Sequence, residues 1–399
     1  MPKIWLISEF YYPVVVSTGY YVTEIAEYLA KQGKDVGVIC TNNIYYDSDE
    51  RSLIVHEEHN GVDIYRVINS KVEKNHLIKR VLGLFSSSIS LCKLAKKLIK
   101  KDDEVVILTN PAFLMLFMPR VRRKTSCRYH ILVHDIFPEN LVSIGGFNEK
   151  SFIFRYLKKI FDIAYSAADS CISIGCDMTE VIKSKTNNSK PIVQITNWAD
   201  ISDVSLMNKK ETRLYDEYKE KLQENIIFMF AGNLGKAQGI DNLIEAISLI
   251  SSSKAAFVFV GAGAKANDVQ RFSLTDNKVV YAGFRNRSEQ NDFLNVCDVG
   301  IVTLADGMFG LGVPSKSYNL MATGKPILYV GQYNSEIACC ITKYDIGWIV
   351  EPNDPMALKE MVDEIISHPE DISKKGQNAL RVANEVFAKT VVLEQFNQY

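Results

Sequence analysis

Short runs of apolar residues alternate along the chain with longer segments in which apolar residues recur every three or four positions. The first run is Ile4–Ile7, a helical pattern follows over Tyr20–Ala30, and the next apolar run is Asp35–Thr41. The short runs predict buried β-strands and the periodic segments predict α-helices. A strand–helix–strand alternation of this kind predicts a parallel sheet that helices cover on both faces.

This alternation occurs twice along the chain. The two halves are separated by a charged segment over residues 199–224, which we interpret as a linker with a surface helix. The expected strands of the first half lie at 105–108, 129–133, 171–174 and 191–195, with a hairpin made by Leu53–Val55 and Val62–Val67. Those of the second half lie at 226–230, 256–260, 279–281, 299–303, 327–330 and 348–350, and helices follow from Ala357. The sequence therefore predicts an α/β protein with two doubly wound parallel sheets and a ligand in the cleft between their carboxyl edges. We expect a first domain over 1–198, a second over 199–385, and a helix over 386–399 that packs back on the first.

Composition changes this picture little. The chain has 399 residues, 47% of them hydrophobic, and a formal net charge of −1, which fits two soluble domains and argues against nucleic acid as the main partner. Its eight cysteines form neither a CxxC pair nor a zinc-like grouping with histidine, so we expect free thiols and a cytoplasmic location. We expect no signal peptide, and no apolar run reaches the roughly 20 residues of a membrane span.

Two basic stretches depart from the even charge. Residues 71–101 hold nine Lys or Arg against one acidic residue, interleaved with apolar residues, and 152–161 combine basic and aromatic residues. Basic amphipathic helices of this kind bind anionic membrane surfaces, although the same pattern fits a helix that packs on its own sheet and leaves its lysines in water. Having two in one half favours a peripheral position on the inner face of the cell membrane.

Three glycine-rich segments follow predicted strands in the second half. The stretch 306–316 has three glycines in six residues and ends with Pro314 and Lys316 at the start of a predicted helix. The stretch 230–239 has three glycines beside Lys236, and Gly261–Gly263 forms a GxG turn. Glycine lets the backbone approach a ligand closely, while helix starts and lysines attract anions. Together the loops indicate a diphosphate; an ordinary loop–helix–strand connection is the alternative.

A histidine and a carboxylate, His134 and Asp135, follow a predicted strand of the first half. An α/β fold places reactive groups at such strand ends, although a histidine that merely caps the strand fits as well. Gly19 lies at the first strand–helix connection, which we expect to face the same cleft.

The order of these motifs resembles the family-four glycosyltransferases of the two-Rossmann GT-B fold. The resemblance rests on Thr18–Gly19, His134–Asp135, Ala231–Lys236, Val260–Gly263, Gly312–Lys316 and Met321–Ile327. Within the family the chain is similar to bacterial members that build O-antigen and capsule units. The resemblance implies transfer of an N-acetylated amino sugar from a UDP donor to a lipid-diphosphate-linked sugar, with retained configuration, and it implies neither a metal nor another cofactor.

Site residues carry over from the family by position. His134 would hydrogen-bond the donor sugar, Lys236 and Lys316 would neutralise the diphosphate, and residues 284–287 would line the uracil. The expected catalytic residues are His134, Lys236 and Lys316. The expected substrate-binding residues are Gly19, Asp135, Asn233, Gly235, Gly261, Phe284, Arg285, Asp306, Gly310, Leu311, Gly312, Val313, Pro314, Ser315 and Asn319.

The chain also departs from the family pattern. Leu311 and Asn319 stand where the family has two glutamates eight positions apart, and Asn233 and Gln238 replace the usual Arg and Lys of the diphosphate loop. Three rivals stay open: a UDP-sugar 2-epimerase of the same architecture, an NAD-dependent oxidoreductase that uses the Gly261 turn, and an inactive subunit that binds UDP. No carboxylate pair at hydrolase separation is identified, which disfavours a glycosidase.

Overall fold

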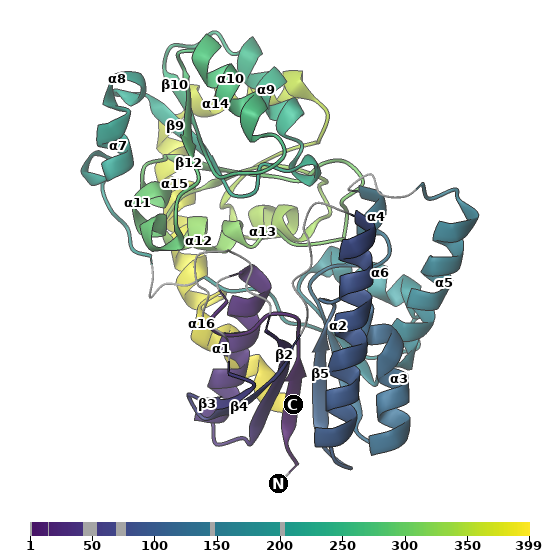
Figure 1. Cartoon of the computed structure of the whole chain (residues 1–399). Helices are drawn as coiled ribbons and strands as arrows, with labels where there is room; N and C mark the ends of the chain where they lie inside the picture. The colour runs from purple at the N-terminus through teal and green to yellow at the C-terminus, as the bar shows by residue number, and fades with distance from the viewer. Residues whose placement is uncertain (1, 15, 43–53, 69–76, 144–147, 200–203) are drawn as a thin grey trace. The chain divides into compact units, whose positions relative to one another are not determined.

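The computed structural model describes residues 2–14, 16–42, 54–68, 77–143, 148–199 and 204–399, and divides into two compact units (Figure 1). The first unit takes the chain up to Ile195 together with Gly310–Gly312 and Leu393–Tyr399; the second takes Thr196–Phe309 and Val313–Val392. Each unit is built on a mostly parallel sheet with helices, as the alternation of apolar runs and helical patterns predicts. The division in the chain falls three residues before the domain boundary expected from the sequence.

The first unit has an eight-stranded sheet in the order β3-β4-β2-β1-β5-β6-β7-β8. Every neighbouring pair is parallel except β3 and β4. Its strands are β1 Ile4–Ile7, β2 Val36–Thr41, β3 His56–His59, β4 Val62–Val67, β5 Glu104–Leu108, β6 Arg128–Val133, β7 Ser170–Ser173 and β8 Ile192–Gln194. Its helices are α1 Ser17–Lys31, α2 Leu77–Leu98, α3 Leu114–Thr125, α4 Asn140–Ser143, α5 Phe152–Ala167 and α6 Cys176–Lys185.

The expected hairpin is present, but its first strand lies at β3 instead of Leu53–Val55. Asn60 and Gly61 form the turn with φ angles of 48° and 77°, which places His59 opposite Val62. A two-residue turn with positive φ at both positions fixes the register of the strands beside it. The polar run of β3 therefore pairs at the sheet edge, and Val55 lies before the strand; Leu53 is outside the described residues.

The second unit has six strands, all parallel, in the order β11-β10-β9-β12-β13-β14. The strands are β9 Ile226–Ala231, β10 Ala255–Val260, β11 Val279–Gly283, β12 Val299–Thr303, β13 Ile327–Val330 and β14 Gly347–Val350. The α-helices after the first unit are α7 Arg213–Glu217, α8 Lys219–Leu222, α9 Ile240–Leu249, α10 Ala266–Thr275, α11 Gln290–Asn295, α12 Lys316–Ala322, α13 Glu336–Tyr344, α14 Pro355–Ser367, α15 Pro369–Glu385 and α16 Lys389–Glu394. The 3-10 helices are η1 Lys209–Glu211, η2 Lys236–Gln238, η3 Arg287–Glu289 and η4 Gln395–Gln398.

Both faces of the second sheet are buried. Along β9, Ile227 and Met229 belong to one apolar cluster, which residues of α12, α13 and α15 complete. Phe228 and Phe230 point to the other face and belong to a second cluster with residues of α9 and α14. Successive side chains of a strand point to opposite faces, so a strand that is covered on both sides reads as a continuous apolar run. This is why the sequence marks these strands clearly.

The end of the chain belongs to the first unit. Phe396 is buried, and the Asn397 side-chain amide donates to the Tyr28 hydroxyl of α1 at 3.2 Å. The ring of the final residue, Tyr399, lies 4.9 Å from the His130 ring on β6. Residues near both ends of the chain therefore complete the same unit.

Candidate active site

The strand order of the second sheet reverses between β9 and β12. In a doubly wound sheet, ligands bind outside the carboxyl ends of the strands at the point of reversal. The loop that follows β9 and the loop that follows β12 are joined there, since the Ala305 amide donates to the Ala237 carbonyl at 2.8 Å. The Thr303 hydroxyl also donates to the Gln238 carbonyl. Two of the three predicted glycine-rich segments therefore meet at this edge.

The loop that follows β10 packs directly on the loop that follows β9. The Gly232 amide donates to the Val260 carbonyl at 2.8 Å, and the Leu234 amide donates to the Ala262 carbonyl at 2.9 Å. Gly261 has a φ of +140°, and a Cβ added to it would lie 1.9 Å from the Gly232 carbonyl oxygen. A side chain has no room at this contact, so Gly261 is needed for the approach of the two loops.

Lys316 is the first residue of α12, and its ammonium lies at the loop that follows β9. The Lys316 Nζ atom is 3.5 Å from the centroid of the Phe230 ring and 3.8 Å from where a Cβ of Gly232 would stand. No described residue forms an ion pair with this half-buried lysine. Burial lowers the pKa of Lys316 to about 7. A cation that is removed from water and lacks a counter-ion is prepared to bind an anion.

Other expected residues of the second unit surround this point less tightly. Asn233 is exposed, and Asn319 follows Lys316 by about one turn of α12. Lys236 begins η2, but its side chain is outside the described part of the structure. Asp306 is exposed and accepts the Gly307 amide at 2.9 Å. The structure therefore brings Lys316 to the glycine loops and leaves the role of Lys236 a prediction.

Pro314 and Ser315 precede α12. We expected Pro314 at the first helical position, but the helix begins at Lys316, and that expectation was wrong. The Ser317 amide and the Ser317 hydroxyl both donate hydrogen bonds to the Pro314 carbonyl, at 3.2 Å and 2.6 Å. This tight turn ahead of the helix delays its first regular residue. Val313 packs against the core cluster on the α12 side of the sheet.

Arg285, expected beside the uracil, is held by a carboxylate. Its guanidinium donates to both carboxylate oxygens of Glu217 on α7, at 3.1 Å and 2.5 Å. This hydrogen-bonded pair raises the pKa of Arg285 further. The neighbouring Phe284 side chain is 58% exposed. Arg285 is therefore held by Glu217, and more than half of the Phe284 side chain is exposed.

His134 and Asp135 follow β6 in the first unit. The backbone amides of both residues donate to the Thr109 hydroxyl at 3.2 Å, which fixes the turn. The His134 ring lies 5.9 Å from the Tyr21 ring, edge to face. Burial lowers the pKa of His134 to about 4, so its imidazole is neutral at pH 7. A neutral imidazole can donate one hydrogen bond and accept another.

Asp135 has its own support. Burial raises the pKa of its carboxyl, and the hydrogen bond from the Asn140 side-chain amide, at 2.9 Å, acts in the opposite direction. Both effects follow from removing a carboxylate from water and giving it a donor. Asn140 therefore helps keep Asp135 ionised.

Three expected glycine-loop residues, Gly310–Gly312, belong to the same unit as this turn. The Gly310 amide donates to the Asp177 carboxylate at 3.2 Å, and the Ile136 amide donates to the Leu311 carbonyl at 3.2 Å. A Cβ on Gly312 would lie 3.9 Å from an Asp135 carboxylate oxygen. Gly310–Gly312 and the His134–Asp135 turn therefore form one cluster.

Gly19 lies inside α1, near its start. A Cβ added to Gly19 would stand 2.8 Å from the Val14 carbonyl oxygen and 3.3 Å from the Cβ atom of Phe10. The glycine thus allows the preceding loop to pack closely on the helix. Its expected contact with a substrate stays a prediction.

Replacing Asn140 with leucine is expected to raise the pKa of Asp135 further, because the buried carboxylate loses a donor. A carboxyl with a raised pKa in the folded state makes stability fall as pH rises through that pKa. The free energy of unfolding should therefore drop by about 1 kcal/mol more between pH 4 and pH 7 than in the unchanged protein. Denaturant titrations at several pH values measure this. The matched control is Asn140→Leu with Asp135→Asn, in which the added pH dependence should vanish.

Sequence reasoning missed several side chains of these clusters. Asp177, Tyr21 and Phe230 contact residues that are distant in sequence, namely Gly310, His134 and Lys316. Of the three, only the position of Asp177 in the sequence could have marked it as a site residue. It stands shortly after the end of β7, on the same carboxyl edge as His134. Tyr21 and Phe230 lie within apolar patterns and read as core residues.

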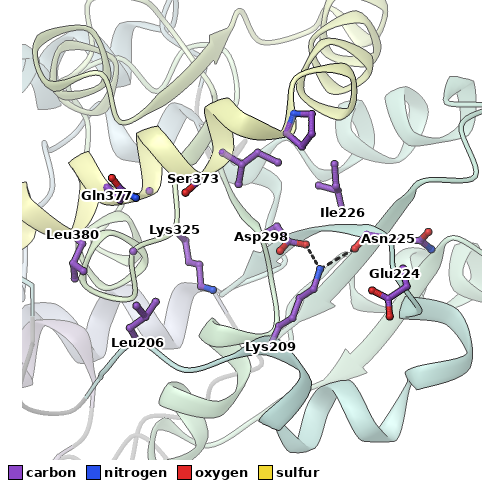
Figure 2. Close-up of a pocket in the computed structure, with 14 residues that line it drawn as sticks. Leu206, Lys209, Glu224, Asn225, Ile226, Asp298, Lys325, Ser373, Gln377 and Leu380 are labelled. Carbon is purple, nitrogen blue, oxygen red and sulfur yellow. Dashed lines mark hydrogen bonds and ion pairs between the residues drawn. The ribbon is translucent and has the colours of Figure 1, made fainter.

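A pocket of the second unit lies at the opposite edge of the sheet, near the first residues of β9, β12 and β13 (Figure 2). Its cations have partners: Lys209 binds the Asp298 carboxylate at 2.6 Å, and the Lys325 ammonium donates to the Asn295 carbonyl at 3.3 Å. Both cations of this pocket therefore have a polar partner, whereas no described residue gives one to the Lys316 ammonium. Within the described residues, no group of three or more His, Cys, Asp or Glu could hold a metal ion.

Known glycosyltransferases are similar to this chain in sequence. Residues 225–368 match the model of the family described as glycosyl transferases group 1. The probable glycosyltransferase WbjE of Pseudomonas aeruginosa is 36% identical over 99% of this chain and 97% of its own length. The Escherichia coli K12 protein provisionally named colanic acid biosynthesis glycosyl transferase WcaI is 20% identical over 99% of this chain and 98% of its own length.

The fold resembles that of solved structures. Anabaena HepE, solved in complex with UDP-glucose, superimposes with a TM-score of 0.70 at 14% identity, over 100% of this chain and 99% of that chain. This likeness concerns the arrangement of the chain, which fits two Rossmann-like units. Because the similarity to WbjE is high and extends over nearly the whole length of both chains, the chain belongs to the group 1 glycosyl transferases, the family-four glycosyltransferases of GT-B fold.

Proposed function

We propose that this glycosyltransferase moves an N-acetylated amino sugar from a UDP donor to a sugar carried on a lipid diphosphate, with retained configuration. The product would be part of a bacterial surface polysaccharide such as O-antigen or capsule. The enzyme would work at the inner face of the cell membrane. The name of WcaI, which mentions colanic acid biosynthesis, supports the polysaccharide role, and the name of WbjE supports glycosyl transfer. The UDP-glucose complex of HepE supports a UDP-linked donor.

The observation that carries the proposal is the uncompensated ammonium of Lys316 at the reversal point of the second sheet. In such a transfer the leaving diphosphate gains negative charge, and a fixed cation in a site that excludes water stabilises that charge. Backbone amides of the glycine loops would add hydrogen bonds, and protein groups would supply the positive charge. The neutral His134 imidazole would hydrogen-bond the donor sugar.

A thermal-shift comparison of UDP, GDP and dTDP tests the donor. UDP at about 100 times its Kd should stabilise the protein by about 2.7 kcal/mol, and GDP and dTDP should stabilise it much less. The same ranking is expected among the sugar derivatives of these nucleotides. Equal shifts from all three, or a larger shift from GDP, would reject the UDP assignment.

A second candidate is a subunit that binds UDP and transfers nothing. It is favoured by the uncharged residues Leu311 and Asn319, where the family has glutamates. Release of UDP from a UDP-sugar in the presence of lipid-linked sugar acceptors separates the two candidates. The transferase should release UDP only with an acceptor, whereas the inactive subunit should release none.

A further inference from the structure

Helix α5 has two apolar faces, and only one of them is covered. Phe154, Phe161, Ala164 and Tyr165 are buried against the unit. Phe152, Ile153, Tyr156 and Ile163 are exposed by 76%, 62%, 60% and 61%. At 100° per residue these four fall within one third of the helix circumference. An apolar stripe that the protein's own packing leaves uncovered indicates an interaction surface.

Two exposed basic side chains, Arg155 and Lys159, border this stripe. Neither forms an ion pair with another described residue. Lys158, on the inner side of the helix, is instead paired with Asp162 at 3.0 Å and Glu139 at 3.3 Å. The cations next to the exposed apolar residues are therefore the ones left without counter-ions.

A row of phenylalanines joins α2 and α3 to the covered face of α5. Phe85 of α2 lies 5.7 Å from Phe113 and 5.3 Å from Phe117, ring to ring, and Phe113 lies 6.4 Å from Phe161 of α5. Arg120 extends over the Phe117 ring at 5.7 Å. Figure 1 shows α2, α3 and α5 as neighbouring blue helices.

Three apolar side chains of α2 are exposed beside this row: Val81 by 42%, Leu82 by 62% and Phe85 by 42%. We use the name α2–α5 face for the exposed side chains of two neighbouring helix regions: Val81, Leu82 and Phe85 of α2, and Phe152, Ile153 and Tyr156 of α5, with Arg120, Arg155 and Lys159. The side chains of 77–80 are outside the described part.

We propose that the α2–α5 face docks on an anionic phospholipid surface, with its apolar side chains in the headgroup layer and its arginines and lysine on lipid phosphates. The choice of a membrane rests on the proposed function, which gives the acceptor a lipid anchor. Charge also argues for it, because the core of a protein interface is depleted in unpaired charges, whereas basic residues beside aromatic ones suit anionic headgroups. No helix among the described residues is long and apolar enough to span a bilayer.

Co-sedimentation of the full chain with vesicles tests the docking. We expect binding to phosphatidylcholine vesicles that contain about one third phosphatidylglycerol, weaker binding in high salt, and little binding to phosphatidylcholine alone. Phe152→Ser with Ile153→Ser should weaken binding by about tenfold or more, and Arg155→Gln with Lys159→Gln should weaken it and reduce its salt dependence. The matched control is Leu274→Ser, which removes an apolar side chain that is 82% exposed in the second unit and should change nothing.

Several results would overturn the docking. These are no binding of the unchanged protein to the anionic vesicles, equal binding by the Phe152→Ser/Ile153→Ser variant, or a dimer in solution that this variant abolishes. The dimer would assign the face to a second copy of the chain. UDP thermal shifts in the same samples separate this inference from the proposed function: a UDP shift without vesicle binding rejects only the docking, and vesicle binding without a UDP shift rejects only the donor.

Discussion

Replacing Lys316 with methionine is expected to weaken UDP binding by about a hundredfold, because a diphosphate loses a charged partner in a site of low polarity. Methionine keeps the length and apolar stem of lysine, so its contact with Phe230 survives. Isothermal titration with UDP measures the change. The matched control is Lys325→Met, since Lys325 is also buried in the second unit but donates to the Asn295 carbonyl at the opposite edge of the sheet. Equal loss in both variants would remove Lys316 from the binding site.

The same substitution should stabilise the protein without nucleotide. The folded-state pKa of Lys316 lies near 7, below the ordinary value of 10.5, so below pH 7 folding must bury a charged group. The unfolded state binds more protons between these values, and stability therefore rises with pH across that range. At pH 6 the free energy of unfolding of Lys316→Met should exceed that of the unchanged protein by about 2 kcal/mol, and the difference should vanish near pH 10. The value of about 2 kcal/mol is reduced from the full effect of the pKa shift because Lys316 is partly exposed to water. Denaturant titrations at both pH values measure it.

Proton uptake links these two effects. A bound diphosphate restores the ordinary pKa of the lysine, so UDP binding at pH 8 should take up about half a proton or more. Titrations in buffers of different ionisation enthalpy report this number directly. In Lys316→Met the uptake should be absent, and uptake that persists in this variant would mean that another group titrates.

Replacing Gly261 with alanine is expected to destabilise the protein by about 4 kcal/mol or to prevent folding of the second unit. The added Cβ would stand 1.9 Å from a backbone oxygen of Gly232, which no side-chain movement can relieve, and φ is +140°. Clashes with backbone in a strained conformation belong to the severe class of substitutions.

Gly307→Ala is the matched control for this substitution. Gly307 also has a positive φ, +79°, but nothing lies within 4 Å of its added Cβ. The free energy of unfolding of Gly307→Ala should fall by only about 1 kcal/mol, because this substitution adds backbone strain but no clash. Thermal unfolding measures the stability of both variants. A similar loss of stability in each would show that the close contact of Gly261 with Gly232 does not cause the destabilisation.

The strands could be predicted because the burial of a strand determines its pattern of apolar and polar residues. β9 and β10 are covered on both faces and read as unbroken apolar runs, whereas the exposed edge strand β3 is polar and was expected a few residues too early. Its position depends on the turn at Asn60–Gly61, which a search for apolar runs does not detect. Turn geometry, rather than hydrophobicity, decides the register there.

The site could be predicted only in part. Glycines and lysines after strands indicated the right edge of the second sheet, because the strand order makes that edge a binding position. The partners of the charged residues could not be derived in the same way. Arg285 binds Glu217, which is 68 positions away, and Lys316 lies on Phe230, which reads as an ordinary core residue. Such pairings depend on how the helices pack on the sheet, and local patterns in the sequence do not predict this packing.

The segment Leu393–Tyr399, which follows the second unit in sequence but belongs to the first, has a consequence for synthesis. A ribosome releases the chain from its first residue onward, so the second unit, whose residues end at Val392, emerges in full before Leu393–Tyr399. The unit that is begun first is therefore finished last. During translation the surface that receives Phe396 and Tyr399 therefore stays uncovered until Leu393–Tyr399 has been synthesised.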